Sequence, residues 1–369
     1  MYRSFVLTLI ILSLLAHIGC EKIDTPQIKL TPISLDAAST PVPSDFSSEN
    51  NLSSNYQSQI QPFFQNHSQS GSFAGVNGDR IHYYILRHDD SRKGAVVIFP
   101  GRTEPALKYI EVAIDLYNQK YEVYILDHRG QGESEGRVEP YPQSNYQVGY
   151  VNRFEDYITD AKTFVDSIVK PSGSVKRYLL AHSMGGAVAA IYSHLYPSDF
   201  NAIAMTAPMM EIDTGSTPAT AAWNLITYEI SVGNGKKYAS GQKDFNFNLQ
   251  FTDADNDVTQ SEPRFNVKMA LYNSRKEIVL GGVSNKWLFE GFNAGQKIKV
   301  FSSDISSRIL LLQAGNDKIV KPAGQDDFCA KANGCQMEYF PDSFHEILME
   351  RDSIRNLALT KIVRFFNAL

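Results

Sequence analysis

Ser183 lies in the string AHSMGG, residues 181–186, between an apolar run at 178–180 and a helical pattern that follows Met184. A serine at a sharp strand-to-helix turn, flanked by small residues, is typical of a nucleophile elbow, which exposes the hydroxyl at the end of a strand. Ala181 occupies a position where the pattern prefers glycine, whereas Gly185 is kept where the helix packs closest to the strand. A serine that caps an ordinary helix is the alternative, and the string alone leaves both interpretations open.

A nucleophilic serine needs a base, because a hydroxyl is protonated and weakly reactive at neutral pH. A histidine can take the proton and later return it to the leaving group, while a carboxylate fixes the tautomer of the imidazole. In elbow enzymes the three residues follow in the order serine, acid, histidine. Only His194 and His345 come after Ser183. His194 falls within the helix that follows the elbow, too far along to reach back, so the predicted base is His345, in a turn before the last helix.

Asp317 is the predicted acid. It follows an apolar strand pattern that runs into a turn, which places its carboxylate at the same sheet edge as Ser183. The other candidate acids are placed less well, because Asp304 precedes this strand and Asp326 and Asp327 fall on a helix. Asp342 is too near His345 in the sequence to be held by a separate element.

The negative oxygen of an acyl-transfer intermediate needs hydrogen-bond donors. One donor is expected from the backbone N–H of Met184, the residue after the nucleophile. The second is expected from the loop after the third strand, PGRTE at 100–104, where Gly101 allows a tight turn and the N–H of Arg102 can point into the site.

The elements that position these residues alternate between strand and helix patterns. Eight strand patterns lie at 72–76, 81–87, 95–99, 121–127, 177–181, 202–206, 308–313 and 336–340, and five helical patterns at 106–118, 152–168, 185–196, 321–330 and 352–368. Apolar strands that alternate with helices predict an α/β fold with a mostly parallel eight-stranded sheet covered on both faces. The two front strands alternate polar and apolar residues and indicate an antiparallel edge.

The interval 209–300 breaks this alternation, because it has helical stretches but no clear strand. An insertion there lies over the ligand-binding edge of the sheet, so we expect a cap, with the core formed by 58–208 and 301–369. Its aromatic residues could line a pocket for an acyl chain or form the cap's own small core, and the second is expected for most of them. These residues are Trp223, Tyr228, Phe245, Phe247, Phe251, Trp287 and Phe289.

The chain has 369 residues, 43% of them hydrophobic, which is enough for one large core with an insertion. A net charge of -5 gives no reason to expect a nucleic-acid partner. The string DHRGQGES at 127–134 has glycines for a tight turn but not the spacing of a nucleotide loop, and Asp127 and Arg129 are expected to brace neighbouring loops.

The first twenty residues resemble the signal peptide of a bacterial lipoprotein. Arg3 precedes an apolar stretch at 5–15, and Gly19 is followed by Cys20, the residue that would carry the lipid. Residues 21–57 are rich in Ser, Thr, Pro and Asn and are predicted to be a flexible tether. We therefore expect an exported, membrane-anchored protein of the bacterial envelope; an ordinary cleaved signal, with a soluble periplasmic or secreted protein, is the alternative.

Cys329 and Cys335 are close enough in the sequence to close a small loop by a disulfide bond, which suits an exported protein. Metal binding is disfavoured, because no second Cys or His pair lies nearby. Two unrelated thiols are the remaining alternative.

Several motifs in this order resemble the bacterial lysophospholipases of the monoglyceride-lipase-like α/β-hydrolases. They are PGRTE at 100–104, DHRGQG at 127–132, HSMGG at 182–186, AP at 207–208, LLQAGND at 311–317 and HEIL at 345–348. The resemblance implies a catalytic triad of Ser183, Asp317 and His345, an oxyanion hole formed by the amides of Arg102 and Met184, and a cap that bears the acyl-chain pocket.

The expected function is hydrolysis of carboxylic esters of single-chain lipids, lysophospholipids or monoacylglycerols, through an acyl-enzyme and without a cofactor. The expected partners are a lipid ester and a membrane surface. The same fold could instead cleave short esters or peptides with a small N-terminal residue. A surface lipoprotein that binds lipid without catalysis is the alternative from another class.

Overall fold

The computed structural model describes residues 29–35, 46–88, 92–254 and 256–369. The predicted signal peptide and Cys20 lie outside these residues. Within the described ranges, no helix is both long and apolar enough to cross a membrane.

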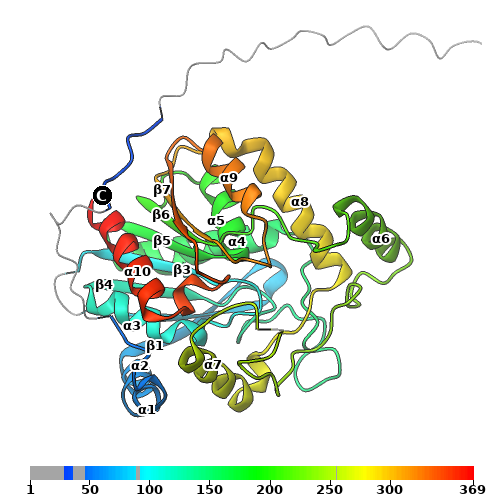
Figure 1. The fold of residues 1–369 in the computed structure, drawn as a ribbon, viewed down its shortest axis with the longest axis horizontal. Helices are drawn as coiled ribbons and strands as arrows, with labels where there is room; N and C mark the ends of the chain where they lie inside the picture. Colours follow the sequence, from blue (N-terminus) through cyan, green and yellow to red (C-terminus); the bar gives the residue numbers. More distant parts are fainter. Residues whose placement is uncertain (1–28, 36–45, 89–91, 255) are drawn as a thin grey trace, which may run out of the picture.

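A single eight-stranded sheet forms the centre of the protein, in the order β1-β2-β4-β3-β5-β6-β7-β8 (Figure 1). The strands are β1 (Ser68–Ala74), β2 (Arg80–Leu86), β3 (Gly94–Phe99), β4 (Tyr121–Leu126), β5 (Arg177–His182), β6 (Ala202–Thr206), β7 (Ile309–Ala314) and β8 (Cys335–Phe340). β1 and β2 pair antiparallel at one edge, and the strands from β4 to β8 are parallel. The predicted mostly parallel sheet with an antiparallel front edge is therefore confirmed.

Helices cover both faces of the sheet, as predicted. They are α1 (Leu52–Asn55), α2 (Gln61–His67), α3 (Ile110–Asn118), α4 (Glu155–Phe164), α5 (Met184–Leu195), α6 (Ala219–Ser231), α7 (Glu262–Ser274), α8 (Asn285–Phe301), α9 (Pro322–Lys331) and α10 (Asp352–Asn367). Alternate residues of β3 enter different cores: Val96 and Ile98 pack with α3 and α10, whereas Val97 and Phe99 pack with α4, α5 and α8. A strand buried on both faces must be apolar throughout, which explains the continuous apolar runs in the sequence.

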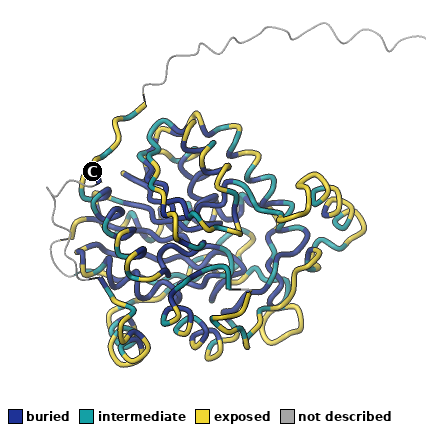
Figure 2. The backbone as a smooth tube through the Cα atoms, viewed as in Figure 1, coloured by how far each residue is buried: buried dark blue, intermediate teal, exposed yellow. Residues whose placement is uncertain are grey.

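The interval 209–300 holds α6, α7 and most of α8, and its described residues form no strand. α8 packs against α5, and its Trp287, Ala294 and Ile298 belong to the same core as the sheet. α6 is largely exposed, with only Ile226 buried (Figure 2). The end of the predicted cap is thus a helix of the main body, and α6 is the part of the interval that projects most.

The described part of the predicted tether is folded against the core rather than free. Phe46, Leu52 and Tyr56 are buried, and the backbone N–H of Ser47 donates to Asp115 of α3 over 2.8 Å. The folded body therefore begins before residue 58, where the sequence analysis placed its start. The sequence analysis missed these contacts because residues 46–57 are mostly polar and Phe46, Leu52 and Tyr56 are widely spaced among them.

Cys329 at the end of α9 and Cys335 at the start of β8 form a disulfide bond. The bond closes the short turn between the last helix before β8 and the strand itself, as the spacing of the two cysteines predicted.

Candidate active site

Ser183 is the single residue between the end of β5 and the start of α5, and its backbone is strained. Its φ of 50° and ψ of -117° are unfavourable for a residue with a side chain and cost on the order of 1–3 kcal/mol. The surroundings hold it there: its N–H donates to Thr206 O over 3.1 Å, and its carbonyl accepts the N–H of Met209 over 2.9 Å. This is the conformation expected of a nucleophile elbow.

The small residues around Ser183 are required by close packing. A Cβ at Gly185 would lie 2.1 Å from the carbonyl oxygen of Phe99, and one at Gly186 would lie 2.4 Å from Cβ of Pro208. Ala181, which stands where the pattern prefers glycine, is fully buried in β5 and pairs with Phe99 and Met205. Its methyl group belongs to the core that also contains residues of α4, α5 and α8, and Ser183 has the elbow conformation with this alanine present.

Asp317 and His345 meet at the same sheet edge, from the turns after β7 and β8. Oδ2 of Asp317 lies 2.7 Å from Nδ1 of His345, and both side chains are almost completely buried. Oδ1 of Asp317 accepts the backbone N–H groups of Ile319 and Val320. A carboxylate that accepts from Nδ1 leaves Nε2 of His345 as the proton acceptor, which is the tautomer a general base needs.

The charge of Asp317 is maintained by these contacts. Burial alone would raise its pKa, but the hydrogen bond and charge of His345 and the two backbone N–H groups outweigh burial, so the pKa lies below its usual value. The carboxylate is therefore ionised at neutral pH and can stabilise a positive charge on the imidazole.

Ser183 and His345 line one cavity of about 600 Å³. Part of its wall is apolar and includes Ile212, Ile226 and Leu288. This volume lies in the range of small-molecule sites.

Of the two predicted oxyanion donors, Met184 follows Ser183 directly in the chain, and Arg102 lines the same cavity as Ser183. Within the described part of the chain, the backbone N–H groups of Arg102 and Met184 donate to no other group. A Cβ at Gly101 would lie 2.9 Å from the ring of His182, so the loop before Arg102 approaches the elbow closely. The role of both N–H groups as oxyanion donors stays a prediction.

A buried charge network supports the same loop and was missed by the sequence analysis. Glu104 accepts hydrogen bonds from Gly101 N, Lys108 Nζ and Tyr109 OH, each over 2.6 Å. Lys108 also pairs with Glu346, the residue after His345, over 2.5 Å. One lysine thus ties the oxyanion loop to the histidine turn. Glu104 and Glu346 belong to the quoted motifs, but the sequence offers no sign that Lys108 joins them.

The network controls the ionisation of its members. Burial alone would raise the pKa of Glu104, but the charge of Lys108 and the hydrogen bonds from Lys108 and Tyr109 lower it to about 2. Burial would lower the pKa of Lys108, yet the two carboxylates raise it above its usual value. Burial lowers the pKa of His182 despite the nearby Glu104 carboxylate, so this ring is neutral at neutral pH.

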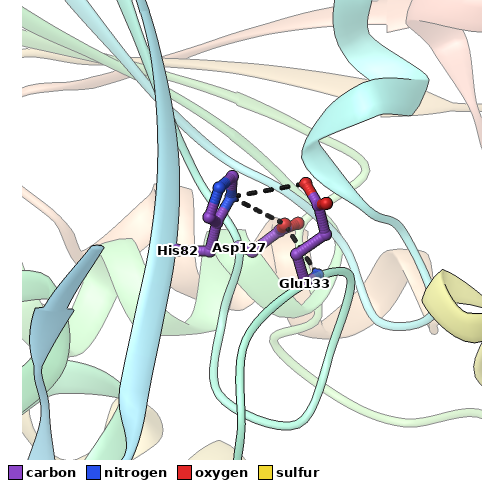
Figure 3. A group of neighbouring side chains, drawn as sticks. All are labelled: His82, Asp127 and Glu133. Carbon is purple, nitrogen blue, oxygen red and sulfur yellow. Dashed lines mark hydrogen bonds and ion pairs between the residues drawn. The ribbon is translucent and has the colours of Figure 1, made fainter. Parts of the chain in front are cut away.

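A separate cluster of His82, Asp127 and Glu133 joins β2 to the loop after β4 (Figure 3). Nδ1 of His82 lies 3.8 Å from Asp127 Oδ2 and 3.5 Å from Glu133 Oε2. The carboxylates already accept hydrogen bonds from the backbone of Ala106, from Tyr84 and from other neighbours. We interpret the cluster as a brace between strand and loop, the role expected for Asp127.

Arg129, the other residue expected to brace loops, pairs with Asp160 of α4 over 2.7 Å and with Asp79 over 2.9 Å. Asp160 also accepts the N–H of Val76. These contacts link the loop after β4 to α4 and to the turn between β1 and β2.

Most aromatic residues of the interval 209–300 pack among themselves, as expected. Trp223 stacks on Phe289, with ring centroids 4.8 Å apart, and Phe251 contacts Phe265. Trp287 is the member of the predicted set that lines the cavity.

A strained serine after the central strand, with a buried acid–histidine pair at the ends of later strands, defines an α/β-hydrolase. The family described as "Serine aminopeptidase, S33" matches residues 90–352. The chain belongs to this family of α/β-hydrolases.

Named relatives and solved structures agree with this assignment. The chain is 36% identical over 313 residues to lysophospholipase L2 of Escherichia coli, covering 82% of this chain and 89% of that protein. It is 23% identical to a monoacylglycerol lipase of Mycolicibacterium smegmatis, covering 76% of this chain and 90% of that protein. A thermostable carboxyl esterase from Bacillus coagulans has the same fold, with a TM-score of 0.65 at 16% identity, covering 82% of this chain and 98% of that chain. The resemblance indicated by the motifs is thereby confirmed.

Proposed function

We propose that this protein is a serine hydrolase that cleaves the carboxylic ester of a single-chain lipid through an acyl-enzyme on Ser183. The observation that carries the proposal is the strained Ser183 beside a cavity that also holds His345, whose Nδ1 is bonded to a buried, ionised Asp317. Relatives named lysophospholipase and monoacylglycerol lipase support an ester as the substrate.

In the first half of the reaction, His345 Nε2 takes the proton of the Ser183 hydroxyl while Oγ attacks the ester carbonyl carbon. The backbone N–H groups of Arg102 and Met184 stabilise the negative oxygen of the tetrahedral intermediate. His345 then gives the proton to the departing glycerol oxygen, and the acyl group stays on Ser183.

In the second half, His345 takes a proton from water, and the resulting oxygen attacks the acyl-enzyme. The second intermediate collapses to release the fatty acid, and the proton returns to Ser183. The apolar wall formed by Ile212, Ile226 and Leu288 suits an acyl chain.

A substrate panel tests the proposal. Purified protein is compared with its Ser183→Ala variant on a lysophospholipid, a monoacylglycerol and an aminoacyl amide. We expect wild type to release fatty acid from at least one lipid ester and Ser183→Ala to release none. A wild-type protein that binds these lipids without cleaving them would instead support a non-catalytic lipid-binding lipoprotein.

An aminopeptidase on the same fold is the second candidate, and one acidic side chain favours it. Asp213 lines the cavity and, among the described residues, has no cationic partner, so it could receive a free amino group. Preferential cleavage of the aminoacyl amide, lost in Asp213→Asn, would select this activity.

We further propose that the protein is anchored in the bacterial envelope through a lipid on Cys20. The basic start, short apolar stretch and Gly19-Cys20 pair support the anchor. We expect Cys20→Ser to shift the protein from the membrane fraction to the soluble fraction. An unchanged membrane share would exclude lipidation of this cysteine.

A further inference from the structure

The side chain of Arg102 extends away from the oxyanion loop into a setting built for a guanidinium group. Its Nη2 donates to the carbonyl of Gly281 over 2.6 Å, and Cζ lies 5.2 Å from the ring centroid of Trp287. A Cβ at Gly149 would lie 2.3 Å from Nη2, so the absence of a side chain there leaves room for the guanidinium.

Arg102 is nevertheless an unbalanced charge. In the described part of the chain, Arg102 pairs with no carboxylate, and its Nε is buried without a hydrogen-bond partner. The side chain donates one hydrogen bond there, from Nη2 to the carbonyl oxygen of Gly281. By contrast, the buried Arg129, Arg264 and Arg355 each pair with a carboxylate. Guanidinium groups are planar donors suited to phosphate and carboxylate, and burying one without an anion is costly.

Arg102 and Ser183 line the same cavity, which Trp287, the ring next to the guanidinium, also lines. So do Ser240 and Gln242, which come from the segment beside Gly281. Gln242 accepts the N–H of Val283, next to this segment. Among the acidic residues that line this cavity, Glu104 and Glu346 are paired with Lys108, and Asp213 forms no ion pair with Arg102 in the described chain.

We propose that the Arg102 guanidinium binds the phosphate group of the substrate, so that the preferred single-chain lipid is a lysophospholipid rather than a monoacylglycerol. This inference rests on the proposed ester hydrolysis. In a lysophospholipid the phosphate follows the scissile ester by the few bonds of one glycerol unit. The length of the Arg102 side chain is comparable to the distance between the ester and the phosphate. The backbone N–H of Arg102 can therefore donate to the ester oxygen while its guanidinium binds the phosphate.

The test is a ratio of specificities. Wild type, Arg102→Gln and Arg137→Gln are assayed on 1-oleoyl-lysophosphatidylethanolamine and 1-oleoylglycerol in the same mixed micelles, and the kcat/KM for the first is divided by that for the second. Arg102→Gln keeps the backbone amide. Arg137 is a matched control, because it is a partly buried arginine without a carboxylate partner in the described chain. It donates to the carbonyls of Tyr146, Val279 and Gly132 and does not line the cavity.

We expect the ratio to fall by about tenfold or more in Arg102→Gln, as for the loss of a charged hydrogen bond, and to stay at the wild-type value in Arg137→Gln. Arg102→Lys should recover part of the ratio. Because a ratio cancels the concentration of active enzyme, partial misfolding does not affect it. A ratio within about twofold of wild type in Arg102→Gln would overturn the inference.

Two further outcomes separate the possible failures. If wild type cleaves neither ester, the proposed function itself fails; if it cleaves both and the ratio does not respond to Arg102→Gln, the headgroup inference alone fails. Inorganic phosphate is added in a third arm. Phosphate could strongly and competitively inhibit the cleavage of 1-oleoylglycerol by wild type but not by Arg102→Gln, while the specificity ratio is the same in both proteins. This result would assign the site to free phosphate and overturn the headgroup assignment.

Discussion

Replacing Lys108 by methionine tests whether the buried charge network holds the active site together. Lys108 Nζ lies 2.6 Å from Glu104 and 2.5 Å from Glu346, and all three side chains are buried. Methionine fills a similar volume but leaves two buried carboxylates without their shared cation. Breaking a buried ion pair on one side costs about 3–5 kcal/mol, so we expect Lys108→Met to lower the free energy of unfolding by that amount.

Activity should fall as well, because the carboxylate of Glu104 accepts a hydrogen bond from the N–H of Gly101, the residue just before the predicted oxyanion donor Arg102. If Glu104 shifts, the donor shifts, and losing one such donor reduces kcat by about 10²–10³-fold at most. We therefore expect a lower kcat in the protein that remains folded, with a smaller change in KM.

Urea denaturation and ester hydrolysis on the same preparations measure both effects. Lys331→Met is the control, because Lys331 forms an exposed pair with Asp327 on α9 that contributes at most about 1 kcal/mol. The reasoning would be refuted if Lys108→Met had the same free energy of unfolding as Lys331→Met and kept the wild-type kcat.

Three other changes probe the site. Asp317→Asn can keep the hydrogen bonds from Ile319 and Val320 to Oδ1, but it presents an N–H to His345 Nδ1 and so forces the wrong tautomer of the imidazole. We expect kcat to fall about 10⁴-fold with little loss of stability, and a decrease below tenfold would count against the assignment. Gly185→Ala places a methyl group 2.1 Å from Phe99 O and should lower the midpoint of thermal unfolding sharply. In the control Gly235→Ala the nearest atom is 3.6 Å away, so its midpoint should stay close to that of wild type, and equal midpoints in the two variants would contradict the packing argument. The pKa of Glu104 in the folded state, about 2, is below its ordinary 4.5, so its stabilisation is complete above pH 4.5 and is lost as the pH falls toward 2. Glu104→Gln should therefore flatten the loss of stability in this window, and an unchanged acid profile would show that Glu104 does not contribute to it.

The sheet could be predicted because its strands are buried on both faces and so form uninterrupted apolar runs. The positions of Ser183, Asp317 and His345 followed from chain order and from the rule that parallel strands bring their carboxyl ends to one edge. Both kinds of inference depend only on local sequence and on the direction of the strands.

The contacts that the sequence did not reveal join residues through side-chain packing. Lys108 meets Glu346 across more than two hundred positions of sequence, and no periodicity encodes such a pairing. The same holds for the guanidinium of Arg102 beside Gly281, and for Phe46, whose burial depends on a surface formed by other elements. The role of α8 was missed because a helix that packs on the core and one that belongs to a cap carry similar amphipathic patterns.

The central claim, that Ser183 is the nucleophile of a hydrolase, is tested most directly by a fluorophosphonate probe followed by intact-mass and peptide mass spectrometry. Such probes react covalently with an activated serine hydroxyl. We predict one adduct on wild type, located on the peptide that contains Ser183, and none on Ser183→Ala. An unlabelled wild-type protein, or a Ser183→Ala variant that labels as strongly as wild type, would contradict the account.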